Sequence, residues 1–290
     1  MLITILTPTY NRATLLLRLY NSLKDQRCKN FEWIVIDDGS TDNTLEVMRG
    51  IIDEPLFKII YIKQENGGKH RAVNKGVSIA NGELVFIADS DDILPEDAIT
   101  TVADMWRKID NKDTFGGMAG LDMSISSRKI IGSGLPKDYI DCNAIDIRYK
   151  CHVEGDLKEV FRTSVLKEFP FPEIDNERFC PEALVWNRIA LKYKLRYINK
   201  VIYLVEYQPE GLTSNIVKVR MKSPISSMMC YSEMTQLNIP FKDRMKAAIN
   251  YWRFRFCISR KDIPSLSGRW FWTAPIGWLM HLKDIRTTKS

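Results

Sequence analysis

The sequence predicts an α/β fold built on a mostly parallel sheet, followed by a helical C-terminal extension. Over the first hundred residues, short runs rich in Val, Ile and Leu alternate with patterns of helical spacing. Strands that are apolar on both faces and alternate with helices form parallel sheets. The 290 residues are 45% hydrophobic and 27% charged, which excludes a disordered or low-complexity chain and predicts one large domain with a smaller appendage.

The first half of the chain supplies four expected strands and four expected helices. The strands are the apolar runs at residues 2–10, 31–39, 57–64 and 83–91. The helices are Ala13–Gln26 (with leucines at 15, 16, 19 and 23), Asp42–Ile52, Lys69–Ala80, and one that Pro95 opens and that ends near Lys108. Each of the first three helices connects one strand to the next, as crossovers in a parallel sheet do.

The second half has weaker patterns, and residues 110–172 are mixed. Later elements are expected as a helix, a strand and two further helices: Glu182–Lys194, Leu195–Tyr207, and helices near 219–236 and 242–258. After Gly211 the composition becomes more basic and aromatic. We therefore divide the chain into a domain at 1–214, with halves at 1–109 and 110–214, and an extension at 215–290.

The charge is distributed unevenly along the chain. Residues 218–290 hold 14 Lys and Arg against 4 Asp and Glu, a balance of +10, and the remaining residues balance at −4, which gives the overall +6. Such asymmetry indicates an anionic partner for the extension, either a membrane surface or a nucleic acid. The extension has no zinc-finger, RRM-like or recognition-helix pattern, so no nucleic acid is expected.

The cysteines and the hydropathy pattern favour a cytoplasmic protein. Six cysteines without C-x-x-C spacing are typical of reduced, packed thiols. The first segment is a poor signal peptide, and no window of about 18 residues is free of charge, so no membrane-spanning helix is expected.

Acidic residues follow two of the expected strands. Asp37 and Asp38 come after one, and Asp89, Asp91 and Asp92 come after another. In an open parallel sheet the carboxyl ends of the strands form the ligand-binding edge, where crowded carboxylates suit Mg²⁺ or Mn²⁺. The alternative is that these residues cap helices and form turns, with Asp92 as an N-cap. The absence of G-x-G-x-x-G after the first strand, and of G-x-x-x-x-G-K-[ST], argues against a dinucleotide-binding oxidoreductase and a P-loop NTPase.

Four runs carry a resemblance to a known family: T-P-T-Y-N-R, I-V-I-D-D-G-S-T-D-N-T, N-G-G-K-H-R-A-V-N-K-G and G-E-L-V-F-I-A-D-S-D-D. In this order, over residues 2–99, they closely resemble family 2 glycosyltransferases of the GT-A fold, inverting enzymes of the bacterial surface-polysaccharide type. The resemblance implies a Rossmann-like sheet whose half at 1–109 binds a nucleotide sugar, usually UDP-linked, while 110–214 binds the acceptor. It implies transfer of a hexosyl or N-acetylhexosaminyl group, with inversion, to a hydroxyl of a glycan such as capsule or O-antigen.

The same resemblance implies roles for single residues. The donor is expected to contact Pro8, Tyr10, Arg12, Asp38, Asn66, Gly68, Lys69, Asn74, Asp89 and Ser90. Asp89 and Asp91 match the D-x-D pair, which implies a Mn²⁺ or Mg²⁺ ion shared with the phosphates. Gly76 also falls in the matching N-x-G stretch. Lys69, with its neighbours His70 and Arg71, either meets phosphate or forms a solvated helix start.

The expected catalytic base is Glu182. The run C-P-E-A-L-V-W-N-R aligns Trp186 and Arg188 with the family's W-x-R, so Glu182 takes the place of the family's aspartate and Pro181 replaces a glutamate. The alternatives are that Glu182 only favours a helix N-terminus, or that Asp175 or Glu177 is the base. The run at residues 207–213 is similar to the family's closing loop but lacks its His and Arg.

Two questions stay open at the level of sequence. The first is whether the protein is an enzyme or a non-catalytic nucleotide-sugar or glycan-binding module of the same fold. The second concerns residues 251–286, which mix aromatic and basic side chains and cannot span a bilayer. They are expected to attach the protein peripherally to an anionic membrane, the inner face of a bacterial cell membrane, or else to pack on the catalytic domain or another subunit. The oligomeric state is not predicted.

Overall fold

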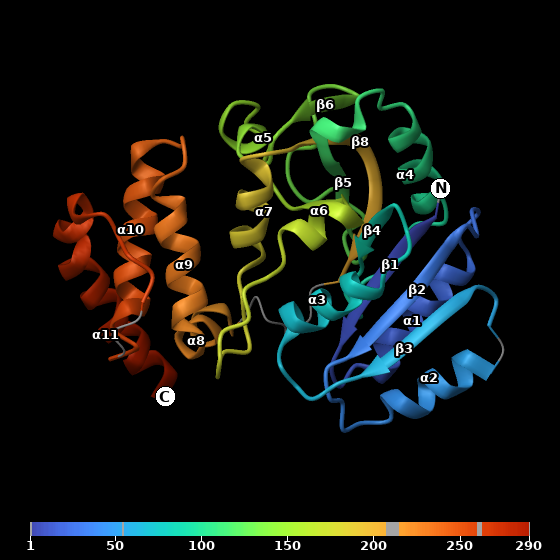
Figure 1. The fold of residues 1–290 in the computed structure, drawn as a ribbon, viewed down its shortest axis with the longest axis horizontal. Coiled ribbons are helices and arrows are strands. Elements are labelled where there is room, and N and C mark those ends of the chain that lie inside the picture. The colour runs from blue at the N-terminus through green and yellow to red at the C-terminus, as the bar shows by residue number, and fades with distance from the viewer. Residues whose placement is uncertain (1, 54, 207–214, 260–262, 290) are drawn as a thin grey trace. The chain divides into compact units, whose positions relative to one another are not determined.

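The computed structural model describes residues 2–53, 55–206, 215–259 and 263–289 (Figure 1). It divides into two compact units: Met1–Pro170 with Arg188–Gln208, and Phe171–Asn187 with Pro209–Ser290. The segment 171–187, which the sequence division placed in the half at 110–214, thus belongs to the unit that contains the C-terminal helices.

The first four strands of the sheet are parallel, as predicted. They are β1 (Ile3–Thr9), β2 (Phe31–Asp37), β3 (Lys58–Lys63) and β4 (Leu84–Ile87). In the eight-stranded sheet they occupy one side of the order β3-β2-β1-β4-β7-β5-β8-β6. Every residue of β1, β2 and β4 is buried, which explains their continuous apolar runs.

The other side of the sheet is mixed. Its strands are β5 (Phe115–Ser124), β6 (Tyr139–Cys142), β7 (Leu157–Arg162) and β8 (Lys194–Val205). Strand β7 runs antiparallel to both β4 and β5, β6 runs antiparallel to β8, and β5 and β8 are parallel. Only β8 was expected from the sequence.

The helices of the first unit connect these strands. They are α1 (Ala13–Lys24), α2 (Thr44–Asp53), α3 (Lys69–Ile79), α4 (Ala98–Arg107), the short α5 (Asp146–Tyr149) and α6 (Thr163–Glu168), and the 3-10 turn η1 (Lys112–Thr114). The four longer ones confirm the predicted helices within two or three residues. Trp33 of β2 and Trp106 of α4 are fully buried in the core. Helix α7 (Glu182–Ala190) spans the boundary between the two units.

The second unit is helical, as predicted for the extension. Its elements are α8 (Ile216–Lys222), α9 (Pro224–Met234), α10 (Phe241–Arg255), the 3-10 helix η3 (Gly268–Thr273) and α11 (Ala274–Lys289). The single helix expected near 219–236 is two helices, because Pro224 disfavours helical geometry at the residue before it, Ser223. Within the described residues, every helix is too short or too polar to cross a bilayer.

Candidate active site

The carboxyl ends of the parallel strands lie at one edge of the sheet. The strand register sets Thr9 of β1 beside Asp37 of β2, and Asp37 beside Lys63 of β3. Strand β4 ends at Ile87, level with Leu6 of β1. The loops that follow these four strands therefore leave the sheet at the same edge, and they carry most of the residues predicted to bind the donor.

Asp38 connects the end of β2 to the loop before α3. Its Oδ1 accepts hydrogen bonds from the backbone N–H of Gly67 (2.9 Å) and from Gln64 Nε2 (2.8 Å), and its Oδ2 accepts one from the N–H of Gly68 (2.7 Å). The side chain is buried, and Gly68 has a φ of +97°, a conformation that favours glycine. The contacts of Asp38 thus fix the backbone of the loop in which the predicted donor residues Asn66 and Gly68 lie.

Replacing Asp38 with alanine should weaken UDP binding and lower the free energy of unfolding. The backbone donors of Gly67 and Gly68 would lose their acceptor, which costs about 1–3 kcal/mol. Calorimetric titration with UDP and urea unfolding measure the two effects, with the exposed Asp53→Ala as the matched control. An unchanged UDP affinity in a destabilised Asp38→Ala variant would contradict a role for this loop in donor binding.

The loop after β1 is held by two residues that the sequence analysis did not single out. Asn11, at φ +52°, accepts a hydrogen bond through Oδ1 from the N–H of Thr41 (2.7 Å), and its own N–H donates to Ser40 Oγ (2.9 Å). Their only signal was their position within the T-P-T-Y-N-R and D-D-G-S runs. The loop presents Tyr10, which is exposed, and Arg12, which is partly exposed.

Of the other predicted donor residues in this part of the chain, Pro8 is buried within β1, and Asn66 and Asn74 are partly exposed. Gly76 packs α3 against the sheet, because a Cβ there would lie 2.0 Å from Leu6 Cδ1. Close packing explains this glycine without any contact to a nucleotide.

Lys69 forms an ion pair with the D-x-D motif. Its Nζ lies 2.6 Å from Asp89 Oδ1, so Lys69, the partly exposed first residue of α3, also pairs with the motif. Burial raises the pKa of Asp89, but the positive charges of Lys69 and Lys158 outweigh it, and the net pKa is lowered. The first residue of α3 therefore places a cation beside the carboxylate predicted to meet the donor.

Asp91, the second acid of the motif, is only partly compensated, by the positive charges of Arg12 and Lys69. Burial and the negative charge of Asp89 raise its pKa. The neighbouring Ser90 is buried. Asp91 and Asp89 thus form a pair of carboxylates in which one is balanced by lysine and the other is held in an unfavourable electrostatic environment, which a bound cation would relieve.

Asp92 is not the N-cap that the sequence suggested. Helix α4 begins only at Ala98, with Asp97 at its N-cap position. The buried Asp92 instead accepts a hydrogen bond through Oδ1 from the N–H of Glu206 (3.1 Å), at the end of β8. Burial and the charge of Asp89 raise the pKa of Asp92 to about 7.

Two residues that the sequence did not identify lie next to the D-x-D turn: Tyr203 on β8 and Lys158 on β7. The backbone N–H of Asp89 donates to Tyr203 Oη (2.6 Å), and Lys158 Nζ lies 3.9 Å from the centroid of the Tyr203 ring. On β5, burial raises the pKa of Asp122 to about 6, although the charge of Lys158 opposes the shift. The half-buried Lys158 and the buried Asp92 and Asp122 thus interact electrostatically with Asp89 of the turn.

The carboxylate oxygens of Asp89 and Asp91 suit a hard divalent cation that is also coordinated by a bound ligand. Among the described residues, no group of three or more His, Cys, Asp or Glu side chains is placed to hold a metal. Mg²⁺ is usually bound by one or two carboxylates together with substrate phosphates and water. Asp89 and Asp91 supply two carboxylates of that kind, two residues apart in the turn after β4.

Glu182 and Glu177 lie in the second unit and differ sharply in environment. Glu182 is the exposed first residue of α7. Glu177 is buried and accepts hydrogen bonds from the N–H groups of Ile225 (2.6 Å) and Ser226 (2.8 Å) and from Ser226 Oγ (2.6 Å). Glu177 therefore caps the N-terminus of α9, which argues against its being the base. The loop at 207–213 lies outside the described residues.

Glu177→Ala should destabilise the second unit by about 3 kcal/mol, because it removes a charged acceptor from three buried donors. Urea unfolding of the full chain measures the loss, and the exposed Asp175→Ala on the same segment is the control. At a temperature where the Glu177 variant remains folded, its kcat should equal that of the wild type. A collapse of kcat in folded protein would return Glu177 to the list of candidate bases.

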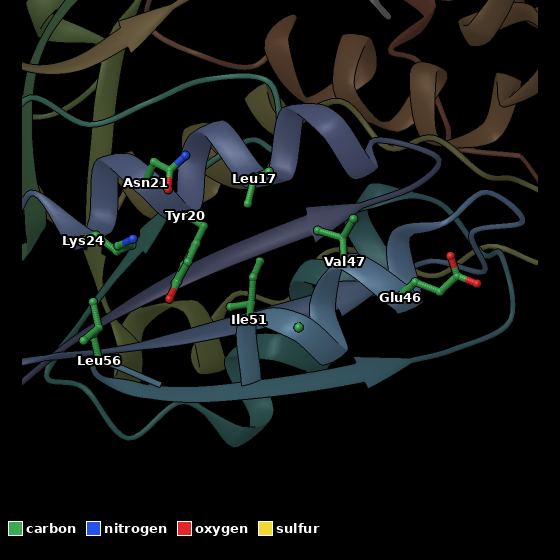
Figure 2. A pocket seen from close by; sticks show the side chains of 9 residues that line it. Leu17, Tyr20, Asn21, Lys24, Glu46, Val47, Ile51 and Leu56 are labelled. Carbon is green, nitrogen blue, oxygen red and sulfur yellow. The ribbon is translucent and has the colours of Figure 1, made fainter. Parts of the chain in front are cut away.

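A cavity of about 590 Å³ between α1 and α2 contains none of the predicted site residues (Figure 2). Its lining includes Leu17 and Tyr20 of α1, Val47 and Ile51 of α2, and Leu56. The candidate site is thus carried by the loops at the strand ends and not by this cavity.

Comparison with known proteins finds glycosyltransferases. Residues 4–129 match the model of glycosyl transferase family 2. GlyG, a glycosyltransferase of Streptococcus pneumoniae serotype 4, is 27% identical over 263 residues, which cover 84% of this chain and 87% of GlyG. The Campylobacter jejuni GalNAc(5)-diNAcBac-PP-undecaprenol beta-1,3-glucosyltransferase is 29% identical over 223 residues, 75% of this chain and 70% of that protein. A match to S. pneumoniae GlyA, 37% identical, spans only 14% of GlyA.

Solved structures share the fold. Residues 1–349 of Staphylococcus aureus TarS, in complex with UDP-GlcNAc, superpose with a TM-score of 0.62 at 20% identity, covering 90% of this chain and 74% of that one. The mannosyltransferase PcManGT of Pyrobaculum calidifontis, in complex with GDP-Man and Mn²⁺, gives a TM-score of 0.57 at 19% identity, covering 96% and 73%. The family match thus assigns residues 4–129 to glycosyl transferase family 2, and the chain has the GT-A fold of the solved glycosyltransferases.

Proposed function

We propose that this protein transfers a sugar from a UDP-sugar to a hydroxyl of a glycan acceptor, with inversion of the anomeric centre. The observation that carries the proposal is the D-x-D turn at the sheet edge, where Lys69 pairs with Asp89, two residues before Asp91. TarS in complex with UDP-GlcNAc and PcManGT with GDP-Man and Mn²⁺, which share the fold, support a nucleotide-sugar donor. The sugar is a hexose or an N-acetylhexosamine.

The residues of the chain would divide the work as follows. Asp38 fixes the backbone of the loop at 64–68. The loop after β1 presents Tyr10 and Arg12 to the nucleobase of the donor. Lys69 places a positive charge where the diphosphate leaves. Glu182 takes the proton of the acceptor hydroxyl, which attacks the anomeric carbon from the face opposite the nucleotide.

Asp89 and Asp91 would hold the metal. A bound Mn²⁺ or Mg²⁺ would supply electrostatic stabilisation of the negative charge on the departing UDP. The complex of PcManGT with Mn²⁺ supports this proposal.

The acceptor is proposed to be a lipid-linked glycan under construction, in the synthesis of capsule, O-antigen or another surface polysaccharide. The name of the C. jejuni relative, an undecaprenol-linked glycan glucosyltransferase, supports this class of acceptor. The reaction would take place in the cytoplasm with the protein held peripherally at the inner face of the cell membrane. No nucleic acid is part of the proposal.

A screen of nucleotide sugars tests the donor. A ligand that binds only the folded state raises its melting temperature in proportion to affinity, so a UDP-sugar in the presence of Mn²⁺ should give the largest shift. A shift with GDP-mannose alone would replace the UDP assignment. Release of UDP from the bound donor, with or without an acceptor, separates an enzyme from a binding module: stabilisation without any turnover would favour the module.

A further inference from the structure

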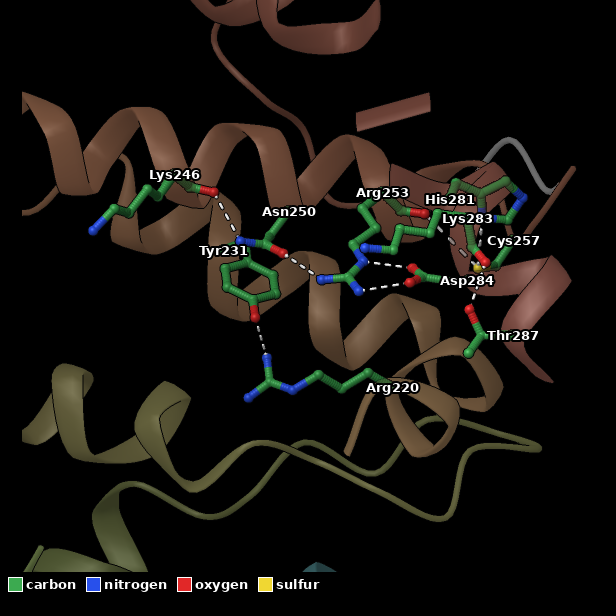
Figure 3. Close-up of polar contacts among 10 residues, drawn as sticks. All are labelled: Arg220, Tyr231, Lys246, Asn250, Arg253, Cys257, His281, Lys283, Asp284 and Thr287. Atoms are coloured by element: carbon green, nitrogen blue, oxygen red, sulfur yellow. Dashed lines mark hydrogen bonds and ion pairs between the residues drawn. The ribbon is translucent and has the colours of Figure 1, made fainter. Parts of the chain in front are cut away.

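Helix α11 buries polar and small residues, the reverse of an ordinary surface helix. Asp284 is buried and accepts hydrogen bonds from Arg253 Nε (2.5 Å) and Nη2 (2.7 Å) on α10, and His281 Nδ1 lies 3.6 Å from Cys257 Sγ (Figure 3). A Cβ at Gly277 would lie 2.5 Å from Trp252 Cβ, so the two helices pack closely. The inner face of α11 is therefore specified by an ion pair and a glycine, not by apolar side chains.

Many of the large apolar side chains of η3 and α11 are exposed instead, although Trp270 of η3 is buried. Five of them are between 42% and 60% exposed: Phe271, Trp272, Ile276, Trp278 and Leu279. Ile276 and Leu279 are three residues apart in α11 and share one side of it, and Trp272 lies in η3, directly before this helix. We call this set of five residues the outer face. A patch of large apolar side chains that the fold leaves exposed marks an interaction surface.

Within η3 and α11, the exposed charged residues next to the outer face are positive. Lys283 and Arg286 follow Leu279 by four and seven residues on the same side of α11, and Arg269 precedes Trp270; all three are exposed. The sequence of α11 contains one carboxylate, Asp284, and the pair with Arg253 keeps it on the inner face. The outer face thus combines aromatic and aliphatic side chains with cations and presents no acid from this helix.

We propose that the outer face binds the headgroup region of an anionic lipid bilayer. Trp, Phe and Leu beside Lys and Arg are the composition of helices that lie in the membrane interface. Two copies of this chain meeting through the outer face would bring Lys283 and Arg286 close to the same cations of the other copy, whereas anionic headgroups neutralise them. The +10 balance of residues 218–290 attracts such a surface.

This inference deepens the proposed function, since it assigns the membrane attachment to named residues, and it is tested without any activity measurement. The full-length protein is sedimented with vesicles of phosphatidylcholine alone or mixed with phosphatidylglycerol, at low and high salt. We expect binding only to the anionic vesicles, weakening as salt rises. The variant Trp272→Ser, Ile276→Ser, Leu279→Ser should stay in the supernatant, and Lys283→Glu with Arg286→Glu should lower the affinity by about 30-fold or more, since each cation contributes roughly fivefold.

Matched controls lie on the first unit. Leu191 and Leu56 are exposed to a similar or greater extent than the outer face, and Leu191→Ser and Leu56→Ser should bind vesicles like the wild type. Circular dichroism establishes that each variant is folded. With brominated lipids, quenching of tryptophan fluorescence should fall in Trp272→Phe, Trp278→Phe, although this variant keeps its affinity.

Several results would overturn the inference. They are full-length protein that remains in the supernatant with anionic vesicles at low salt, binding that survives the triple serine substitution, and quenching that does not change without Trp272 and Trp278. A wild type that fails to bind vesicles but changes oligomeric state on the triple substitution, seen by sedimentation velocity, would assign the outer face to a second copy of the chain. None of these experiments measures UDP-sugar turnover, so the proposed transfer reaction is tested separately.

Discussion

Glu182→Gln should lower kcat by about 10²–10⁴-fold, the usual contribution of a general base, while the affinity for the donor stays close to that of the wild type. Glutamine keeps the size of the side chain but cannot accept a proton from the acceptor hydroxyl. Glu182 is exposed at the start of α7, so its substitution should not destabilise the protein. Donor binding by titration calorimetry and steady-state release of UDP give the two quantities.

A conservative variant adds a readout that a structural role would not change. If Glu182 is the base, Glu182→Asp keeps a carboxylate and should restore part of the rate that Glu182→Gln loses. Asp175→Asn is the matched comparison, because Asp175 is also exposed and was the other open candidate. Near-normal turnover in Glu182→Gln, with a loss in Asp175→Asn, would reassign the base.

The sequence predicted the parallel half of the fold well because its periodic signals are strong there. Strands β1, β2 and β4 are buried on both faces, so their apolar runs are continuous. Strand β5 was missed because its G-G-M-A-G run has low strand propensity. Its glycines serve the packing: a Cβ at Gly117 would lie 2.1 Å from Val160 O, and one at Gly120 2.7 Å from Ile202 Cγ1. Close approach between strands here overrides local propensity.

Helix α11 was missed for the opposite reason. Prediction of a helix from sequence depends on apolar residues that face inward. Residues 274–289 show aromatic and basic residues without an apolar stripe at helical spacing. The structure shows that Asp284 and Gly277 form the inner face. A helix specified by an ion pair with α10 has no hydrophobic periodicity from which it could be predicted.

At the candidate site, the sequence identified acids but not what surrounds them. Asp89 is recognisable as a strand-end carboxylate, yet Tyr203, which accepts its N–H, is 114 residues away. Lys158 lies on β7, in the region where the pattern was weakest. Contacts between residues so far apart in the sequence depend on the strand order β4-β7-β5-β8. A short sequence motif carries no information about that order.

Removing divalent metal should abolish transfer, and restoring it should recover the rate. EDTA is expected to remove activity, and excess Mn²⁺ or Mg²⁺ to return it, because Asp89 and Asp91 carry the oxygen ligands that such ions prefer. Asp91→Asn at saturating metal should lower kcat by about 10²–10³-fold, the usual cost of losing one group that stabilises the developing charge. Asp97→Asn, an exposed acid in the same region, should keep full activity.

The charges of Asp89 and Asp91 allow a test of whether Asp91→Asn loses its response to metal without losing its fold. Asp91 lies under the repulsion of Asp89, so Asp91→Asn removes an unfavourable charge, and the free variant should be at least as stable as the wild type. The wild type should gain stability when Mn²⁺ is added together with UDP, and the variant should not, although UDP alone affects both alike. Lys69 already balances Asp89, so the metal response should depend more on Asp91 than on Asp89. Full activity in EDTA, or an undiminished Mn²⁺ response in Asp91→Asn, would remove the metal from the mechanism and leave Lys69 as the main positive charge beside the leaving diphosphate.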